Sequence, residues 1–248
     1  MIVYDHAAQA RFHTVDGARA ALRAVFPAAF PSTVLDLGCA TGTWLKACAE
    51  RGAVEMVGLE FVDIPQGDML IPKHHVRAAD LCKPINLERT FELVICLETA
   101  EHLRPECSET LVDTMTRHAD CILFSAAAPG QPGMNHINCQ WPSYWQLLFN
   151  ARGFVCDDSV RWTIWDNDAI EPWYRQNLMM VCRDPGRAGS EPRIPAVLHP
   201  DMVKMNALQF LDENAKIIQD GAMPLGWYPI ALAKALRAKA RRRLGVRT

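Results

Sequence analysis

The sequence has 248 residues, of which 50% are apolar and 22% are charged, and its net charge is −2. This length suits one large domain, or one domain with a small extension, and the apolar content allows a core without disulfide cross-links. No apolar run reaches the roughly 20 residues that a membrane-spanning helix needs, and the first residues lack the charged start and apolar stretch of a secretory signal. We therefore expect a cytoplasmic protein.

Short β-type runs alternate with helical stretches, which is the pattern of a parallel sheet covered by helices on both faces. Continuous apolar runs such as LVICL indicate strands that are buried on both faces. Strands are predicted over residues 33–37, 53–60, 74–80, 91–97, 121–127, 153–162 and 177–182. Helices are predicted over residues 6–25, 41–51, 105–118 and 141–151.

The composition changes at residue 184, where a segment rich in proline, glycine and charge begins, which is typical of a linker. Beyond it, apolar residues recur at near-helical spacing, and a second, alanine-rich helix is predicted over 229–244. We therefore divide the chain into a domain, residues 1–183, and a linker with a helical extension, residues 184–248.

Charge is distributed unevenly along the chain. Residues 221–248 hold seven basic side chains and no acidic ones, which leaves 19 basic against 28 acidic side chains in residues 1–220. The acidic main body repels polyanions, so the sequence disfavours nucleic acid as the principal substrate. The basic C-terminal helix can rest on an anionic membrane surface, where each nearby cation contributes about 1 kcal/mol. The alternative is a solvated helix that packs on the domain or on a second subunit.

Nine cysteines are spread through the chain, and none forms a CxxC pair. Most lie in apolar runs such as FELVICL and CILFSAA, where a free thiol packs like a small hydrophobic side chain. We interpret the cysteines as buried thiols and expect neither a disulfide scaffold nor a zinc site.

The first predicted strand runs directly into the fragment LDLGCATG, in which Asp36 precedes Gly38, Ala40 takes the middle position and Gly42 closes the turn. A strand ending in an acid, followed by a glycine-rich turn and a helix, is a nucleotide-binding arrangement, because glycine lets the backbone approach a ligand closely. A dinucleotide-binding fold would prefer GxGxxG, and no phosphate-binding lysine follows the turn.

This fragment resembles the first motif of class I S-adenosylmethionine-dependent methyltransferases, in which the backbone around Gly38 and Gly42 faces the amino-acid half of the cofactor. Ala40 departs from the commonest GxGxG form. The resemblance covers residues 30–183 well and residues 184–248 poorly. It implies an α/β fold with a doubly wound, seven-stranded, mostly parallel sheet and a C-terminal helical extension.

Further cofactor contacts follow from the same resemblance. Glu60 ends the second predicted strand, where the family has an acid that accepts bonds from both ribose hydroxyls. Asp80 resembles the acid near the adenine amino group, with Leu81 lending its backbone amide. Phe61 and Leu97 complete the cofactor-binding residues that we predict.

The fourth predicted strand ends in CLETAEHLRPE, a loop that lies beside the transferred methyl group in this family. Glu98, Glu101 and His102 form the pattern ExxEH, and His136 follows the fifth strand. On one helical turn the positions i, i+3 and i+4 share a face, so two carboxylates and two imidazoles can converge on one ion. This resembles the site of small-RNA 2'-O-methyltransferases, where a divalent metal grips a ribose diol. Mg²⁺ or Mn²⁺ is expected where carboxylates and water dominate.

The same loop has an interpretation without a metal. An EHL sequence after the fourth strand is widespread in methyltransferases that use none, and there the glutamate touches the cofactor. His102 or His136 would then act as the general base, since an alcohol nucleophile has to lose its proton. Both interpretations stay open at this point.

Seven tryptophan and tyrosine residues gather within residues 141–174, accompanied by polar residues up to Gln176. Flat rings with a polar rim suit sugars or aromatic acceptors. We therefore expect O-methylation of a small hydroxylated acceptor, such as a sugar, a glycan or a secondary metabolite. The alternatives are an RNA 2'-O-methyltransferase with a metal-bound ribose diol, and a cofactor-binding regulatory or scaffold protein.

Overall fold

The computed structural model describes residues 13–243, and they divide into two compact units whose boundary falls between Met202 and Val203. The predicted boundary after residue 183 therefore lies inside the first unit. The start of the predicted helix 6–25 and the last residue of the predicted helix 229–244 lie outside the described residues.

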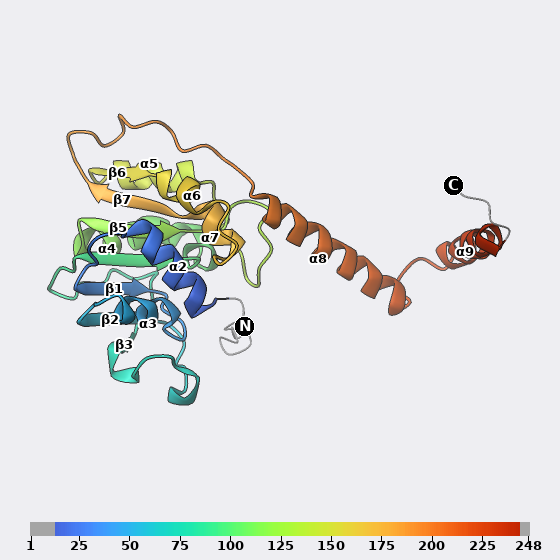
Figure 1. The fold of residues 1–248 in the computed structure, drawn as a ribbon, viewed down its shortest axis with the longest axis horizontal. Helices are drawn as coiled ribbons and strands as arrows, with labels where there is room; N and C mark the ends of the chain where they lie inside the picture. The colour runs from blue at the N-terminus through green and yellow to red at the C-terminus, as the bar shows by residue number, and fades with distance from the viewer. Residues whose placement is uncertain (1–12, 244–248) are drawn as a thin grey trace. The chain divides into compact units, whose positions relative to one another are not determined.

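A seven-stranded sheet forms the centre of the first unit, with the order β3-β2-β1-β4-β5-β7-β6 (Figure 1). Its first five strands pair in parallel, and β7 runs antiparallel to both β5 and β6. The strands are β1 (Thr33–Leu37), β2 (Glu55–Glu60), β3 (Val76–Ala78), β4 (Leu93–Leu97), β5 (Cys121–Ser125), β6 (Phe154–Asp157) and β7 (Met179–Arg183). The predicted seven-stranded, mostly parallel sheet is confirmed, and parallel pairing brings the carboxyl ends of β1 to β5 to one edge.

Two layers of helices cover the two faces of this sheet. Alternate residues of a strand point to opposite faces, and in β4 Val94 and Cys96 join one buried cluster while Leu93 and Ile95 join the other. The first cluster includes residues of α4 (Ser108–His118) and α5 (Pro142–Asn150). The second includes residues of α2 (Val15–Val25), α3 (Thr43–Glu50), α6 (Ser159–Ile164) and α7 (Pro172–Asn177). The continuous apolar strands of the sequence are explained by burial on both faces.

The predicted strand 153–162 is wrong in its second half, because β6 ends at Asp157 and a helix, α6, follows it. The side chain of Asp157 accepts hydrogen bonds from the backbone N–H of Ser159 at 2.8 Å and from its hydroxyl at 2.9 Å. Such a local side-chain bond turns the backbone and ends the strand. Beyond the turn, Arg161 is buried, donates to the carbonyl of Gln176 and pairs with Asp158.

The segment that follows β7 packs on the first unit instead of forming an open linker. Ile194 is buried in the same cluster as α5, and its N–H donates to the side chain of Gln146 at 2.9 Å. The amide of Gln146 in turn donates to the carbonyl of Pro192 at 3.0 Å, and Asn150 donates to Glu191 at 2.6 Å. Polar residues of α5 thus attach this polar segment by hydrogen bonds.

Both predicted C-terminal helices are present, as α8 (Pro200–Gln219) and α9 (Trp227–Arg243). In the turn between them, the hydroxyl of Tyr228 accepts a bond from the N–H of Met223 at 3.1 Å. Within residues 13–243, no helix is long and apolar enough to span a bilayer.

Cys82 and Cys107 form a disulfide, whereas the other seven cysteines are thiols. The expectation that all nine are thiols was therefore wrong for this pair. The fold brings together the loop after β3 and the short 3₁₀ helix η5 (Pro105–Cys107), which are 25 residues apart in sequence. Nothing in the local sequence around either cysteine indicates this pairing.

Candidate active site

The loop between β1 and α3 carries three residues with positive φ: Gly38 at 81°, Ala40 at 45° and Gly42 at 86°. Two of these positions also have no room for a side chain. A Cβ on Gly38 would lie 2.4 Å from the side chain of Thr99, and one on Gly42 would lie 2.6 Å from that of Ile71. Glycine accepts both constraints without strain. The loop therefore lies tightly against two segments, the one that follows β4 and the one that follows β2.

Two buried acids, Asp36 and Glu60, lie next to this loop. Burial and the nearby charge of Glu60 raise the pKa of Asp36 to about 8. The carboxylate of Glu60 accepts hydrogen bonds from the N–H of Ala40 at 3.0 Å, of Phe61 at 2.7 Å and of Val62 at 3.1 Å. Glu60 thus joins the glycine loop to the turn after β2, and its contact with ribose hydroxyls stays a prediction.

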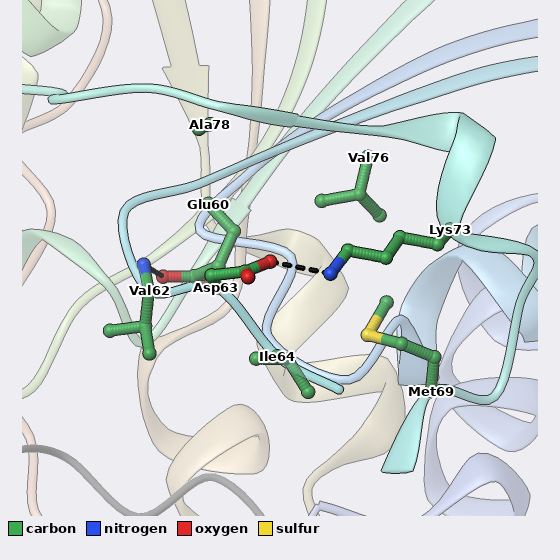
Figure 2. A pocket seen from close by; sticks show the side chains of 8 residues that line it. All are labelled: Glu60, Val62, Asp63, Ile64, Met69, Lys73, Val76 and Ala78. Atoms are coloured by element: carbon green, nitrogen blue, oxygen red, sulfur yellow. Dashed lines mark hydrogen bonds and ion pairs between the residues drawn. The ribbon is translucent and has the colours of Figure 1, made fainter. Parts of the chain in front are cut away.

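A cavity of about 220 Å³ lies beside Glu60 (Figure 2). An ion pair between Lys73 and Asp63, with 2.5 Å between Nζ and Oδ1, stands at this cavity. The remaining lining is apolar and comprises Val62, Ile64, Met69, Val76 and Ala78. Apolar walls with a few polar groups are typical of small-ligand sites.

The other predicted cofactor residues lie at the carboxyl ends of the neighbouring strands. Asp80 follows β3, accepts a bond from the N–H of Cys82 at 3.0 Å and lies 3.4 Å from the ammonium of Lys83. Leu81 is buried in the core, and Leu97 is the last residue of β4. Phe61 exposes 68% of its surface, which leaves its ring open to a ligand.

Glu98, the first acid of the ExxEH pattern, is held by two amide side chains. It has a φ of +50°, which turns it out of the helical geometry. Its Oε2 accepts from Gln131 at 2.6 Å and its Oε1 from Asn177 at 3.2 Å, while Asn177 also donates to Gln131 at 2.8 Å. Sequence reasoning missed Gln131 and Asn177, because each comes from a distant segment and no motif marks either.

Glu101, His102 and His136 come together, with ligand atoms that lie within 4.8 Å of one another. The two imidazole centroids are 5.0 Å apart. Glu101 is fully buried, and among the described residues neither of its carboxylate oxygens has a hydrogen-bond partner. Burial, followed by the charge of Glu98, raises the pKa of Glu101 well above its usual value. Glu98 itself stands outside this trio.

The trio fits a divalent cation. A metal with ligand distances of about 2.1 Å spaces its ligands about 3–4 Å apart, so small side-chain rotations suffice to complete the site. A cation would also satisfy the buried oxygens of Glu101, which otherwise carry a desolvation cost. Burial lowers the pKa of His136, whose Nδ1 lies 3.2 Å from the carbonyl of Gln131. If Nδ1 carries the proton, as this contact favours, Nε2 presents a lone pair.

The aromatic residues of segment 141–174 divide between core and surface. Trp145 and Tyr174 are buried, and the hydroxyl of Tyr174 accepts a bond from the indole of Trp44 at 3.0 Å. Trp162 is 48% exposed and packs against Trp165 with 4.9 Å between ring centroids. Only part of the predicted aromatic platform is therefore open to an acceptor.

Residues 8–121 match a family model described as a methyltransferase domain, and they include the glycine loop and both ExxEH acids. Residues 8–121 thus form a methyltransferase domain, and the seven-stranded sheet has the class I methyltransferase fold. S-adenosylmethionine stays the predicted cofactor of this methyltransferase domain, and the positive φ angles of the glycine loop agree with that prediction. None of the curated protein sequences compared with it matches.

Solved structures with the same fold share little sequence with this methyltransferase. The magnesium protoporphyrin IX methyltransferase of Synechocystis PCC 6803, with bound SAH, is 16% identical at a TM-score of 0.51, covering 74% of this chain and 89% of its own. CalS10, a SAM-bound amino pentose methyltransferase from Micromonospora echinaspora, is 18% identical at a TM-score of 0.50, covering 74% and 99%. The DhpI–SAH complex is 16% identical at a TM-score of 0.50, covering 73% and 94%. These structures therefore share the fold over about three quarters of this chain.

Proposed function

We propose that this methyltransferase methylates a hydroxyl group of a small hydroxylated acceptor, such as a sugar, a glycan or a secondary metabolite. The observation that carries the proposal is the trio of Glu101, His102 and His136, a buried carboxylate with two unpartnered oxygens beside two imidazoles. Glu101 and His102 follow β4, and the close approach of Gly38 to Thr99 brings the cofactor loop against the same segment. We propose that the trio holds Mg²⁺ or Mn²⁺.

The reaction needs an aligned and deprotonated acceptor oxygen. The new C–O bond forms as the C–S bond of the sulfonium breaks, so positioning supplies much of the rate. A divalent ion in the trio would supply positive charge that lowers the pKa of an acceptor hydroxyl. Glu98, fixed by Gln131 and Asn177, borders the trio. Burial raises the pKa of Glu98, and a cation in the trio would favour its charged form.

A histidine base is the alternative chemistry for the same residues. His136 is the stronger candidate, because burial lowers its pKa and keeps the imidazole neutral at pH 7. A neutral Nε2 can accept the hydroxyl proton as the methyl group is transferred. The two mechanisms differ in their response to chelators.

The acceptor class rests on three further observations. Trp162 is exposed and packs against Trp165 with a tilt of 30° between the rings, and such an exposed ring can pack against the apolar face of a sugar. One structural relative, CalS10, is described as an amino pentose methyltransferase. The acidic balance of residues 1–220 disfavours a polyanionic acceptor.

Methyl transfer from labelled S-adenosylmethionine to a panel of acceptors tests the proposal. The panel holds monosaccharides, polyols, hydroxylated aromatics and an RNA oligonucleotide with a terminal diol. We expect a polyol or sugar product, loss of activity with a chelator and recovery with Mn²⁺. Glu101→Gln should lose at least about 100-fold in rate, while the exposed His74→Asn should leave the rate unchanged.

Two outcomes would redirect the assignment. Full activity after chelation would favour the histidine base. Methylation of RNA alone, with a steep dependence on salt, would favour 2'-O-methylation, because binding that neutralises phosphates releases counterions. That second function is kept because the trio also suits a ribose diol.

A further inference from the structure

The Cys82–Cys107 disulfide joins two segments that border the active site. Cys82 lies in the loop after β3, two residues beyond Asp80 and next to Leu81. Cys107 ends the short helix η5, which follows the ExxEH segment. Cys107 is buried, whereas Cys82 is half-buried and is the more accessible sulfur.

Hydrogen bonds connect the residues next to each cysteine of the bridge with the predicted cofactor loop and with the trio. On one side, the N–H of Cys82 donates to Asp80 at 3.0 Å, which shapes the loop expected to bind adenine. On the other side, Ser108 follows the bridge and accepts a bond from Asn138 at 3.0 Å. The N–H of Asn138 donates to the carbonyl of Glu101, also at 3.0 Å. The bridge thus connects the cofactor loop with the support of the trio.

The remaining cysteines indicate that this bond is not part of a disulfide scaffold. Seven cysteines are thiols, and they include Cys121 and Cys182, which are register partners on β5 and β7. The two buried clusters supply a large core without further cross-links. The one disulfide lies beside loop 80–83, which is expected to bind the cofactor, whereas the neighbouring thiols Cys121 and Cys182 are not joined. Such an isolated disulfide at a binding loop is typical of redox-responsive sites.

We propose that Cys82–Cys107 is a reversible thiol–disulfide modification site that adjusts cofactor affinity. The oxidised form holds loop 80–83 in its binding conformation, and the reduced form has to order that loop on binding, which weakens affinity. The proposal rests on the proposed role of Asp80 and Leu81 in cofactor binding.

The exchange requires a dithiol reductant of the thioredoxin class or a small dithiol such as dithiothreitol. One reductant thiolate attacks Sγ of Cys82, the S–S bond breaks, and Cys107 leaves as a thiolate that takes up a proton. The second reductant thiol then attacks the mixed disulfide and releases Cys82 as a thiol. The bridge gains two electrons and two protons, and the reductant becomes a disulfide.

Two measurements on the full chain test the proposal. In the first, alkylation and mass spectrometry of the air-oxidised protein should find Cys82 and Cys107 unlabelled before dithiothreitol treatment and labelled after it. In the second, calorimetric titration with S-adenosylhomocysteine should show about five- to tenfold weaker binding after reduction. Cys82→Ser/Cys107→Ser should bind like the reduced protein in either buffer. The exposed thiol variant Cys182→Ser should respond to reductant like the wild type.

Several results would overturn the proposal. Alkylation of Cys82 and Cys107 before reduction would show that the disulfide does not form. Equal affinity of the oxidised and reduced wild type would show that the disulfide does not affect cofactor binding, while the cofactor site itself would still stand. Absence of binding in both states would overturn the cofactor site together with the proposal. The wild-type comparison stands even if the double variant fails to fold.

Discussion

Gly38→Ala should destabilise the methyltransferase by about 3 kcal/mol. Alanine disfavours the left-handed backbone conformation at this position, and its methyl group would overlap the side chain of Thr99. A left-handed φ, here +81°, costs alanine about 1–2 kcal/mol. The Cβ would also lie 2.4 Å from both Cγ2 and Oγ1 of Thr99, and relief of such overlap costs about 1–3 kcal/mol. Thr99→Ala removes both atoms and leaves its own Cβ at 3.0 Å, so the cost of Gly38→Ala should fall to about 1–2 kcal/mol in that background.

A double-mutant cycle measured by urea denaturation tests this reasoning. We expect a coupling free energy of about 1–2 kcal/mol between Gly38 and Thr99. Ala40→Gly is the matched control, since its φ of +45° is already left-handed and the change should alter stability by less than about 1 kcal/mol. Additive costs at positions 38 and 99, or a Gly38→Ala protein as stable as the wild type, would refute the close packing of the loop.

Three further predictions address pH, domain limits and the C-terminal helix. The raised pKa of Asp36, about 8, means that the folded state favours the protonated acid, so its contribution to stability is complete below about pH 4 and is lost as the pH rises to 8. Asp36→Asn should therefore gain stability relative to the wild type across that window in urea denaturation, and a pH-independent difference would contradict this. A 1–202 fragment should unfold cooperatively in thermal melts, whereas a 1–183 fragment, which loses buried Ile194, should melt at least several degrees lower. We also propose that the basic helix α9 binds anionic vesicles, so flotation should recover more full-length protein than a 1–226 truncation, and equal recovery would contradict it.

Much of the first unit could be predicted because its signals are local. The apolar runs of β1 and β4 need burial on both faces, and LDLGCATG combines an acid with two glycines whose φ angles are positive. The prediction for β6 was too long because residues that favour strands continue past Asp157. In the structure, the hydrogen bonds from Ser159 to the side chain of Asp157 turn the chain there and end the strand. The polar segment after residue 183 resembled a linker because its attachment depends on partners in α5, such as Gln146.

The geometry of the active site could be predicted only in part. The spacing of ExxEH assumed one α-helical turn that includes Glu98, but the left-handed φ of Glu98 separates it from the 3₁₀ helix η4 (Ala100–His102). Its carboxylate therefore meets Gln131 and Asn177 instead of joining the trio. Pairings of this kind depend on tertiary structure, because the partners lie 33 and 79 residues away.

The metal site is tested most directly by calorimetric titration of Mn²⁺ into the wild-type protein with S-adenosylhomocysteine present. The buried, unpartnered oxygens of Glu101 beside His102 and His136 predict one Mn²⁺ per chain. Glu101→Gln should weaken that binding about tenfold or more, since it removes the only carboxylate of the trio, and His74→Asn should leave it unchanged. Equal Mn²⁺ affinity of the wild type and Glu101→Gln, or no binding by the wild type, would contradict the account.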